Sequence, residues 1–297
     1  MSVVVATRDR EELLRHTVAS ILGQDYAGEI DVTLVYDQAV PQASHEHSGD
    51  RRRVRVVAND RAPGLAGARN AGIGRATGDL IAFCDDDDTW RPDKLRRQVE
   101  ALEAARAGAC VTGISVRYDD TVVERIPAVD EITTRALRES RLTGAHPSSY
   151  VMRRDVVAQV GDVDEQIPGG YGEDYDWLVR LAEVGRVVVV RAPLVDVLWH
   201  RGSFFSTRWS AMVESVDYLV AKYPVLVASR PGIARLRGQQ AFALAALGNR
   251  AGALSHAWKA WRANPLEPRV YVTLAVASGL VSATRVMHLA NSRGRGI

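Results

Sequence analysis

One stretch of the sequence organises the rest: residues 80–88 read LIAFCDDDD. Its five apolar residues follow Gly78 and Asp79, and this pattern predicts a short, fully buried strand. Four adjacent carboxylates at the end of that strand repel one another unless a cation lies beside them. Ligands of open α/β sheets bind beyond the carboxyl ends of the strands, so we expect a metal–diphosphate site here. A solvated acidic turn is the alternative interpretation.

Strand and helix patterns alternate on both sides of this stretch. β-branched and apolar runs predict strands, whereas apolar residues three or four apart predict helices. The expected strands are 2–6, 30–36, 54–57, 80–84, 109–118, 148–153 (antiparallel to the rest) and 186–191. The expected helices are 10–22, 64–76, 90–105 and 173–184. These βαβ units predict an α/β protein with a mostly parallel, Rossmann-like sheet flanked by helices.

From about residue 210 the sequence pattern is helical throughout. We therefore expect two parts, an α/β domain at 1–209 and an α-helical C-terminal region at 210–297. The last segment combines apolar residues with Arg285, Arg293 and Arg295. It indicates either a docked helix with a basic end or a segment that lies on an acidic lipid surface.

The composition narrows the classes of protein to consider. A content of 46% hydrophobic and 25% charged residues is typical of a folded globular chain. A net charge of +2, without basic tracts interleaved with aromatics, argues against a nucleic-acid partner. Cys84 and Cys110 fall in expected strands, so we expect buried thiols and no disulfide or zinc site.

No targeting or membrane-spanning pattern stands out in the sequence. The first residues lack a signal-peptide pattern, and no apolar run reaches the roughly 18 to 20 residues that span a bilayer. We therefore expect a cytoplasmic protein, and the basic C-terminal segment leaves peripheral association with the inner face of the membrane as an open alternative.

Five motifs follow one another along the chain. The first two are VVVATRDR at 3–10 and VYD at 35–37, and the third is GLAGARNAG at 64–72. The acidic stretch continues as DDDDTWRP at 85–92, and GYGEDYDW at 170–177 comes last. Together they resemble glycosyltransferase family 2, which contains nucleotide-sugar transferases of the GT-A fold. The resemblance covers the α/β part of the chain and implies that fold and that activity.

The resemblance implies a nucleotide site at the ends of the first strands. Its nucleotide-binding residues here are Ala6, Thr7, Arg8, Asp37, Gly67, Arg69, Asp85 and Asp86. Thr7 and Asp37 end neighbouring strands, so both should point into the same crevice. In the family, the residue matching Asp37 accepts a hydrogen bond from N3–H of uracil, which implies a UDP-linked donor. Tyr36 and the pair at 38–39 depart from the Asp and Gly-Ser usual in the family.

The acidic stretch is where the resemblance places a divalent ion. Asp87 is the first choice for a direct ligand of Mn²⁺ or Mg²⁺, with Asp85 as the other member of an Asp-x-Asp pair. Asp86 would contact the ribose or the metal, and Asp88 would cap the segment before Pro92. The ion would bridge the two phosphates and neutralise the charge that develops as the nucleoside diphosphate leaves.

Basic side chains near this stretch are further candidates. Arg69 would either pair with the diphosphate or hold the acidic loop in place. His200 follows the last strand, and the resemblance makes it a weaker candidate for the metal or the diphosphate. His45, His47 and His146 have no spacing with partners that predicts a metal ligand.

Two acids at the start of an expected helix are the catalytic candidates. The N-terminus of a helix favours an ionised carboxylate, and Asp174 would act there as general base toward an acceptor hydroxyl. A single base opposite the leaving group predicts direct displacement with inversion at the anomeric carbon. Glu173 would orient the donor or the acceptor. The alternative interpretation is a pair of acids that only stabilise the helix dipole.

These features predict an inverting, metal-dependent glycosyltransferase of polysaccharide biosynthesis. It would transfer a sugar from a nucleoside-diphosphate donor to a hydroxyl of a glycan, a lipid-linked carrier or a natural product. One alternative is a degenerate transferase that binds nucleotide or carbohydrate without catalysis. Another is a nucleotidyltransferase, which the absence of a glycine-rich loop at 7–10, after the first strand, disfavours.

Overall fold

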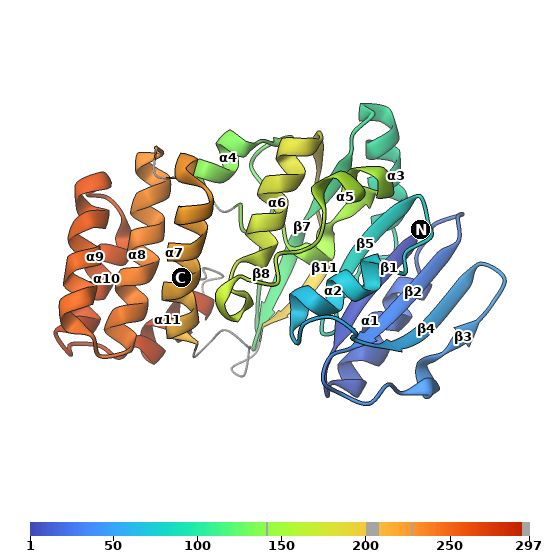
Figure 1. Ribbon diagram of the computed structural model, residues 1–297, viewed down its shortest axis with the longest axis horizontal. Helices are drawn as coiled ribbons and strands as arrows, with labels where there is room; N and C mark the ends of the chain where they lie inside the picture. The colour runs from blue at the N-terminus through green and yellow to red at the C-terminus, as the bar shows by residue number, and fades with distance from the viewer. Residues whose placement is uncertain (141, 200–207, 227, 293–297) are drawn as a thin grey trace.

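The computed structural model describes residues 1–140, 142–199, 208–226 and 228–292. Helices cover both faces of a large mixed sheet, and a bundle of further helices extends from one end of it (Figure 1). This arrangement confirms the expected α/β class with an α-helical C-terminal region. The boundary at residue 209 stays a prediction.

Within the described residues the sheet has eleven strands, six of which build its parallel parts. The strands are β1 (Ser2–Thr7), β2 (Ile30–Tyr36), β3 (His47–Ser48), β4 (Arg52–Ala58), β5 (Leu80–Asp85), β6 (Thr89–Trp90), β7 (Ala109–Tyr118), β8 (Thr121–Arg125), β9 (Glu131–Ile132), β10 (Val151–Arg153) and β11 (Val187–Trp199). Their order is β3-β4-β2-β1-β5-β10-β7-β11-β6, with β8 paired to β7 and β9 to β11. Strands β4, β2, β1 and β5 are mutually parallel, as are β7 and β11. Antiparallel β10 joins the two sets, which confirms both the mostly parallel sheet and the expected antiparallel strand.

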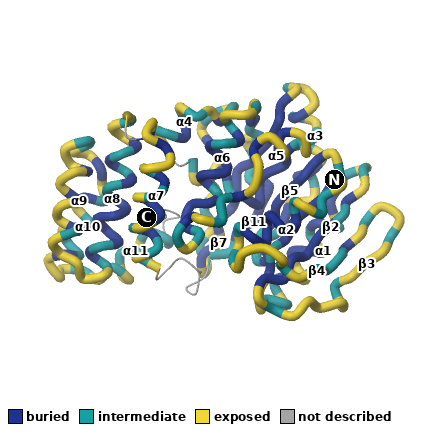
Figure 2. Tube along the Cα trace, in the orientation of Figure 1, coloured by how far each residue is buried: buried dark blue, intermediate teal, exposed yellow. Residues whose placement is uncertain are grey.

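Helices pack on the sheet in two layers. They are α1 (Glu11–Leu22), α2 (Leu65–Ile73), α3 (Lys94–Ala105), α4 (Thr134–Glu139), α5 (Arg154–Val160), α6 (Glu173–Val184), α7 (Trp209–Lys222), α8 (Arg230–Ala246), α9 (Arg250–Ala263), α10 (Pro268–Ala277) and α11 (Ala283–Ser292). Helices α1 and α3 bury Leu14 and Leu95 against one face, and α2, α5 and α6 bury Ala71, Val157 and Trp177 against the other. Figure 2 shows the buried positions following the strands and the inward sides of these helices.

The central strands are apolar because both faces of the sheet are covered. All five apolar residues of β5 are buried, and so are the two cysteine thiols, as the sequence predicts. The register pairs Ala6 with Asp85 and Thr7 with Tyr36. The first and second motifs and the acidic stretch therefore end side by side at one edge of the sheet.

Some element boundaries differ from the expected ones. Trp90 belongs to β6 and pairs with Val195, and α3 begins only at Lys94. Pro92 disfavours a helical conformation at Arg91, which accounts for the late start. The expected strand at 148–153 is shorter, because residues Pro147–Ser149 form a 3-10 turn before β10. Strand β11 is longer than expected and continues past Pro193 with two register shifts.

The helical region begins with a helix that belongs to the main core. Val216, Leu219 and Tyr223 of α7 lie in the same hydrophobic cluster as Trp177 of α6. Beyond it, α9 buries Ala253 and other alanines against α8, and small side chains of this kind allow close helix packing. In the described residues, none of the helices is long and apolar enough to cross a lipid bilayer.

Candidate active site

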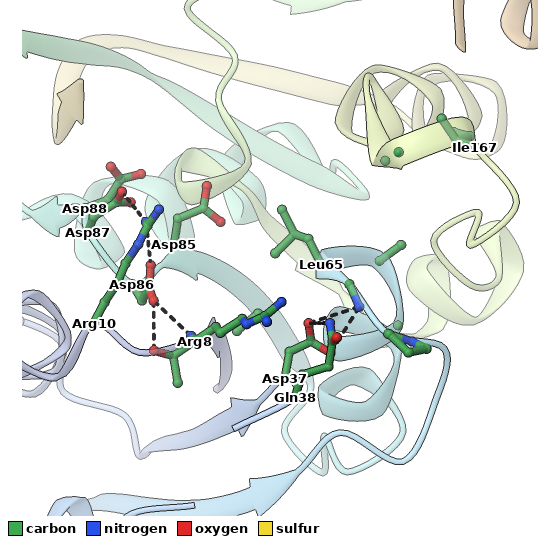
Figure 3. A pocket seen from close by; sticks show the side chains of 18 of the residues that line it. Arg8, Arg10, Asp37, Gln38, Leu65, Asp85, Asp86, Asp87, Asp88 and Ile167 are labelled. Carbon is green, nitrogen blue, oxygen red and sulfur yellow. Dashed lines mark hydrogen bonds and ion pairs between the residues drawn. The ribbon is translucent and has the colours of Figure 1, made fainter. Parts of the chain in front are cut away.

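A pocket of about 720 Å³ lies at the carboxyl ends of β1, β2 and β5. Its wall is completed by the loops before α2 and α6 and by the end of β11. In Figure 3, Asp37 and Gln38 lie on one side of Arg8, and the four aspartates lie on the other. The expected nucleotide residues in its lining are Ala6, Thr7, Arg8, Asp37, Gly67, Asp85 and Asp86. The structure therefore gathers residues of four separate motifs around one cavity.

The end of β1 holds the acidic stretch by hydrogen bonds. Thr7 Oγ1 donates to Asp86 Oδ2 over 2.8 Å, and the Arg8 N–H donates to the same oxygen over 3.4 Å. Arg10 Nη1 joins two carboxylates, at 3.2 Å from Asp86 Oδ1 and 2.7 Å from Asp87 Oδ2. Asp86 is thus turned toward β1, and Arg10 neutralises part of the acidic charge.

Asp37 fixes the loop that precedes α2. The Asn59 amide donates to Oδ1 over 2.8 Å, and the Gly64 N–H lies 3.0 Å from both carboxylate oxygens. The Gln38 amide donates to Oδ2 over 3.0 Å. Burial favours a raised pKa for Asp37, but these hydrogen bonds outweigh burial and lower the pKa below its usual value. Asp37 is therefore an ionised acceptor in the wall of the pocket.

Arg69 joins two acids that come from different motifs. Its Nη2 lies 2.8 Å from Asp85 Oδ1, and its Nη1 lies 2.7 Å from Glu173 Oε1. Burial alone would lower the pKa of Arg69, but Asp85 and Glu173 outweigh burial and raise it. Burial also raises the pKa of Glu173 to about 7, against the effect of Arg69. Of its two expected roles, Arg69 is seen to hold the acidic loop, and contact with a diphosphate stays a prediction.

Replacing Arg69 with alanine is expected to lower the free energy of unfolding by about 3–5 kcal/mol. The reason is that Glu173 would remain buried, and Asp85 partly buried, without their cation. Urea unfolding followed by circular dichroism measures this. Arg75→Ala is the matched control, since Arg75 follows the same helix and pairs with the exposed Asp60. We expect the control to unfold as the wild type does, and equal losses in both variants would contradict the account.

Three side chains are placed so that they could share one metal ion. One ligand atom each from Asp85, Asp88 and His146 lies within 4.8 Å of the others. His146 Nδ1 is 3.4 Å from Asp88 Oδ2, and its Nε2 is 3.9 Å from Asp85 Oδ2. Sequence spacing gave no reason to expect His146 here, and a turn remote in sequence carries it to the acidic stretch as a candidate ligand. The capping role expected for Asp88 was wrong, since its Oδ2 accepts a 2.5 Å bond from Ser148.

Burial and mutual repulsion raise the pKa values of three aspartates in the acidic stretch. Burial raises the pKa of Asp86, and the hydrogen bond from Thr7 opposes this only in part. Burial and the neighbouring Asp85 raise the pKa of Asp87 to about 7. Burial, with Asp85 and Asp87, raises the pKa of Asp88 well above its usual range. A divalent cation would relieve this repulsion, so the residues fit the hard ion that the sequence predicts.

The catalytic candidates stand at the start of α6, behind the pocket wall. Gly169 and Gly170 line the pocket, whereas Glu173 is buried and Asp174 is half-buried outside that lining. Gly172 precedes them with φ 88°, a conformation that favours glycine. The structure thus places Asp174 at a helix N-terminus, as expected, and its role as a base stays a prediction.

Helix α7 and the residue after it bond to the loop before α6 and to α6 itself. Ser215 Oγ donates to the Pro168 carbonyl over 2.8 Å. Asp176 accepts a 2.8 Å bond from the Tyr223 hydroxyl and lies 2.6 Å from Lys222 Nζ. The helical region therefore contributes to the shape of the site.

Two site residues were missed, and one expected residue cannot be placed. Arg10 lies in the first motif, three residues after the end of β1, and this position was the signal for a basic partner of the aspartates. His146 gave no local signal, because 58 residues separate it from Asp88. His200 lies outside the described residues.

Two bacterial proteins are similar in sequence to part of this chain. The succinoglycan biosynthesis protein ExoO of Rhizobium meliloti (strain 1021) is 37% identical over 164 residues, which are 50% of this chain and 45% of ExoO. The Escherichia coli UDP-Glc:alpha-D-GlcNAc-diphosphoundecaprenol beta-1,3-glucosyltransferase WfgD is 25% identical over 137 residues, which are 46% of this chain and 54% of WfgD. The chain thus spans about half the length of these relatives.

Solved structures share the fold along nearly the whole chain. S. aureus TarS (residues 1–349), crystallised with UDP-GlcNAc, superposes with a TM-score of 0.61 and 14% identity, covering 99% of this chain and 92% of TarS. The mannosyltransferase PcManGT of Pyrobaculum calidifontis, in complex with GDP-Man and Mn²⁺, gives a TM-score of 0.56 and 18% identity. That match covers 96% of this chain and 81% of PcManGT.

The family itself follows from the sequence match. The profile described as Glycosyl transferase family 2 matches residues 2–161, which is more than half of the 297 residues. The match includes four of the five motifs and therefore the ends of β1, β2 and β5. This chain accordingly belongs to glycosyltransferase family 2 and has the GT-A fold.

Proposed function

We propose that the protein is an inverting, metal-dependent glycosyltransferase that uses a UDP-sugar and acts in polysaccharide biosynthesis. One observation carries this proposal: the ionised Asp37 and the acidic stretch stand on opposite sides of Arg8 in one pocket. A nucleotide base at Asp37 and a metal-bound diphosphate at the aspartates would fit that arrangement.

The uracil assignment rests on the chemistry of Asp37. A carboxylate accepts N–H donors and cannot donate when ionised, so it suits the N3–H of uracil. Asp37 already receives hydrogen bonds from its own loop, and the Gln38 amide would have to turn aside for a base to bind. The names of two related proteins support uridine, because TarS was crystallised with UDP-GlcNAc and WfgD is named for UDP-Glc.

We assign the metal to Asp85 and Asp87, together with the oxygens of the diphosphate. Asp87 lines the pocket with a partly exposed side chain, whereas Asp88 is fully buried and is bonded to Ser148. Asp85, Asp88 and His146 are the second candidate set, which their mutual distances favour. The ion, Mn²⁺ or Mg²⁺, would neutralise the departing diphosphate. The Mn²⁺ in the PcManGT complex supports a metal at this kind of site.

Asp174 is our candidate for the general base. It would remove the proton from the acceptor hydroxyl as that oxygen attacks the anomeric carbon. The bond between the anomeric carbon and the phosphate oxygen breaks, and the nucleoside diphosphate leaves with the electron pair. Attack from the face opposite the leaving group inverts the configuration. Glu173, held by Arg69, would keep the start of α6 in position.

The acceptor that we propose is a hydroxyl group of a growing glycan. Where the polymer is assembled on a lipid carrier, this glycan is attached to that lipid. ExoO is named for succinoglycan biosynthesis, and the acceptor in the name of WfgD is a sugar on diphosphoundecaprenol. The family match counts against the nucleotidyltransferase alternative.

Product analysis tests this proposal. We would incubate the full chain with UDP-glucose or UDP-GlcNAc, Mn²⁺ and oligosaccharide or lipid-diphosphate-sugar acceptors, and measure the release of UDP. We expect release that depends on the acceptor and on Mn²⁺, with an inverted anomeric configuration in the product by NMR. A product of retained configuration would refute the role of Asp174, and turnover of only GDP- or dTDP-sugars would refute the assignment of uracil.

A further inference from the structure

The C-terminal helices expose an unusual share of large apolar side chains. Nine of the fifteen exposed large hydrophobic residues in the described chain lie between residues 247 and 289. Helix α11 contributes to this because none of its residues is fully buried. Its apolar residues at 286, 287 and 290 are only half-covered, and Leu289 is 48% exposed. Exposed apolar side chains are therefore concentrated in the C-terminal helices, which makes these helices the candidates for an interaction surface.

One part of this surface lies at the same end of the molecule as the pocket. Helix α7 begins directly after the pocket-lining Arg208, and the helices that follow run alternately back to that end and away from it (Figure 1). The turns after α8 and after α10 are therefore both at the pocket end. They carry Leu247, which is 50% exposed, and Leu280, which is 84% exposed.

Helix α11 continues from the second of these turns toward the sheet. His288 Nδ1 lies 3.0 Å from the Tyr118 hydroxyl at the carboxyl end of β7. Tyr118 is paired with Trp199, and Trp199 lines the pocket. Two acidic residues, Asp119 and Asp120, follow Tyr118 and change the character of the surface there. We therefore take the apolar and basic surface to end at His288. We call the residues Leu247, Arg250, Leu280, Arg285 and Leu289 the tail face.

The segment that carries the tail face has a strongly one-sided charge, although Arg262, Glu267 and Arg269 lie beside the turn after α9, at the opposite end. Residues 247–297 contain six arginines and one lysine but a single acid, Glu267. Arg250 and Arg285 are exposed beside the leucines. A surface that combines exposed leucines with arginines matches an anionic lipid interface, where apolar burial and electrostatic attraction add.

We propose that the tail face docks the protein on an anionic lipid bilayer, with the mouth of the pocket at the membrane-facing end. A second copy of the chain is a poorer occupant, because it would bring the arginines of two tail faces together, and the tail face itself contains no acid to pair with them. The docking does not depend on which sugar is transferred, and vesicle binding tests it without any turnover.

Sedimentation with vesicles tests this proposal on the full chain. We expect binding to vesicles of phosphatidylglycerol and phosphatidylethanolamine, weaker binding at higher salt, and little binding to phosphatidylcholine alone. Leu280→Asp should weaken the partition about tenfold, and Arg285→Glu about fivefold or more. Leu266→Asp is the matched control, since Leu266 is also 84% exposed but lies in the turn after α9, at the opposite end.

Three outcomes would overturn the proposal. The first is no binding to anionic vesicles under low salt. The second is an equal loss in Leu280→Asp and Leu266→Asp, which would mean that the tail face is not specific. The third is a dimer in analytical ultracentrifugation that Leu280→Asp dissociates, with no vesicle binding, which would make a second copy the occupant. Circular dichroism of each variant confirms that the helices remain folded.

Discussion

Replacing Asp174 with asparagine is expected to lower the rate of sugar transfer by about a hundredfold to ten-thousandfold. Asparagine has nearly the same shape but cannot accept the proton of the acceptor hydroxyl. Asp174 lies outside the lining of the pocket, so the affinity for UDP with Mn²⁺ should stay within about twofold of the wild type. Transfer assays measure the first effect and calorimetry the second.

A control on the same helix makes the result specific to this carboxylate. Glu183→Gln removes one negative charge from an exposed position near the end of α6. We expect this variant to transfer sugar at the wild-type rate. If Asp174→Asn is also nearly as active as the wild type, Asp174 is not the base, and another group must take the proton.

Loss of the divalent ion is expected to abolish measurable transfer and to weaken UDP binding strongly. The ion is expected to contribute several kcal/mol by neutralising the diphosphate, so a chelator should lower the rate by about a thousandfold or more. Asp87→Ala should reproduce this loss and no longer respond to added Mn²⁺. The variant keeps Asp86 bonded to Thr7 and Arg10, so the loop should remain in place.

Two further variants decide where the ion lies. Asp79→Ala is the control, because Asp79 precedes β5 at the end remote from the pocket and its side chain is fully exposed. We expect it to keep the response of the wild type to Mn²⁺. If His146→Ala instead loses the response and Asp87→Ala retains it, the ion belongs to Asp85, Asp88 and His146.

Much of the fold follows from local sequence. Helix α6 runs over residues Glu173–Val184 as expected, since its apolar spacing is regular and glycines flank it. Strand β5 is buried as expected, because its residues 80–84 are all apolar. The strand ends at Asp85, where the cluster of aspartates begins. The predicted start of α3 at residue 90 was wrong, and the helix begins at Lys94. Pro92 disfavours a helical conformation at Arg91, and this constraint outweighed the helical pattern.

Contacts between remote segments could not be read from the sequence. His146 meets the acidic stretch because Ser148 in its turn bonds both to Asp88 and to the Asp85 N–H. Arg69 pairs with Asp85 and also with Glu173, which lies 104 residues further along the sequence than Arg69. Each of these pairs depends on how β10 and α6 pack against the parallel strands, and residue spacing carries no information about that packing.

Calorimetric titration of UDP into the full chain, with Mn²⁺ and then with a chelator, tests the central claim most directly. Parallel titrations of GDP, CDP and dTDP show whether the base site selects uracil. The account predicts binding of UDP that requires Mn²⁺ and is much tighter than that of the other three nucleotides. Binding of none of the four diphosphates would contradict it, and would favour a degenerate transferase that has lost its donor site.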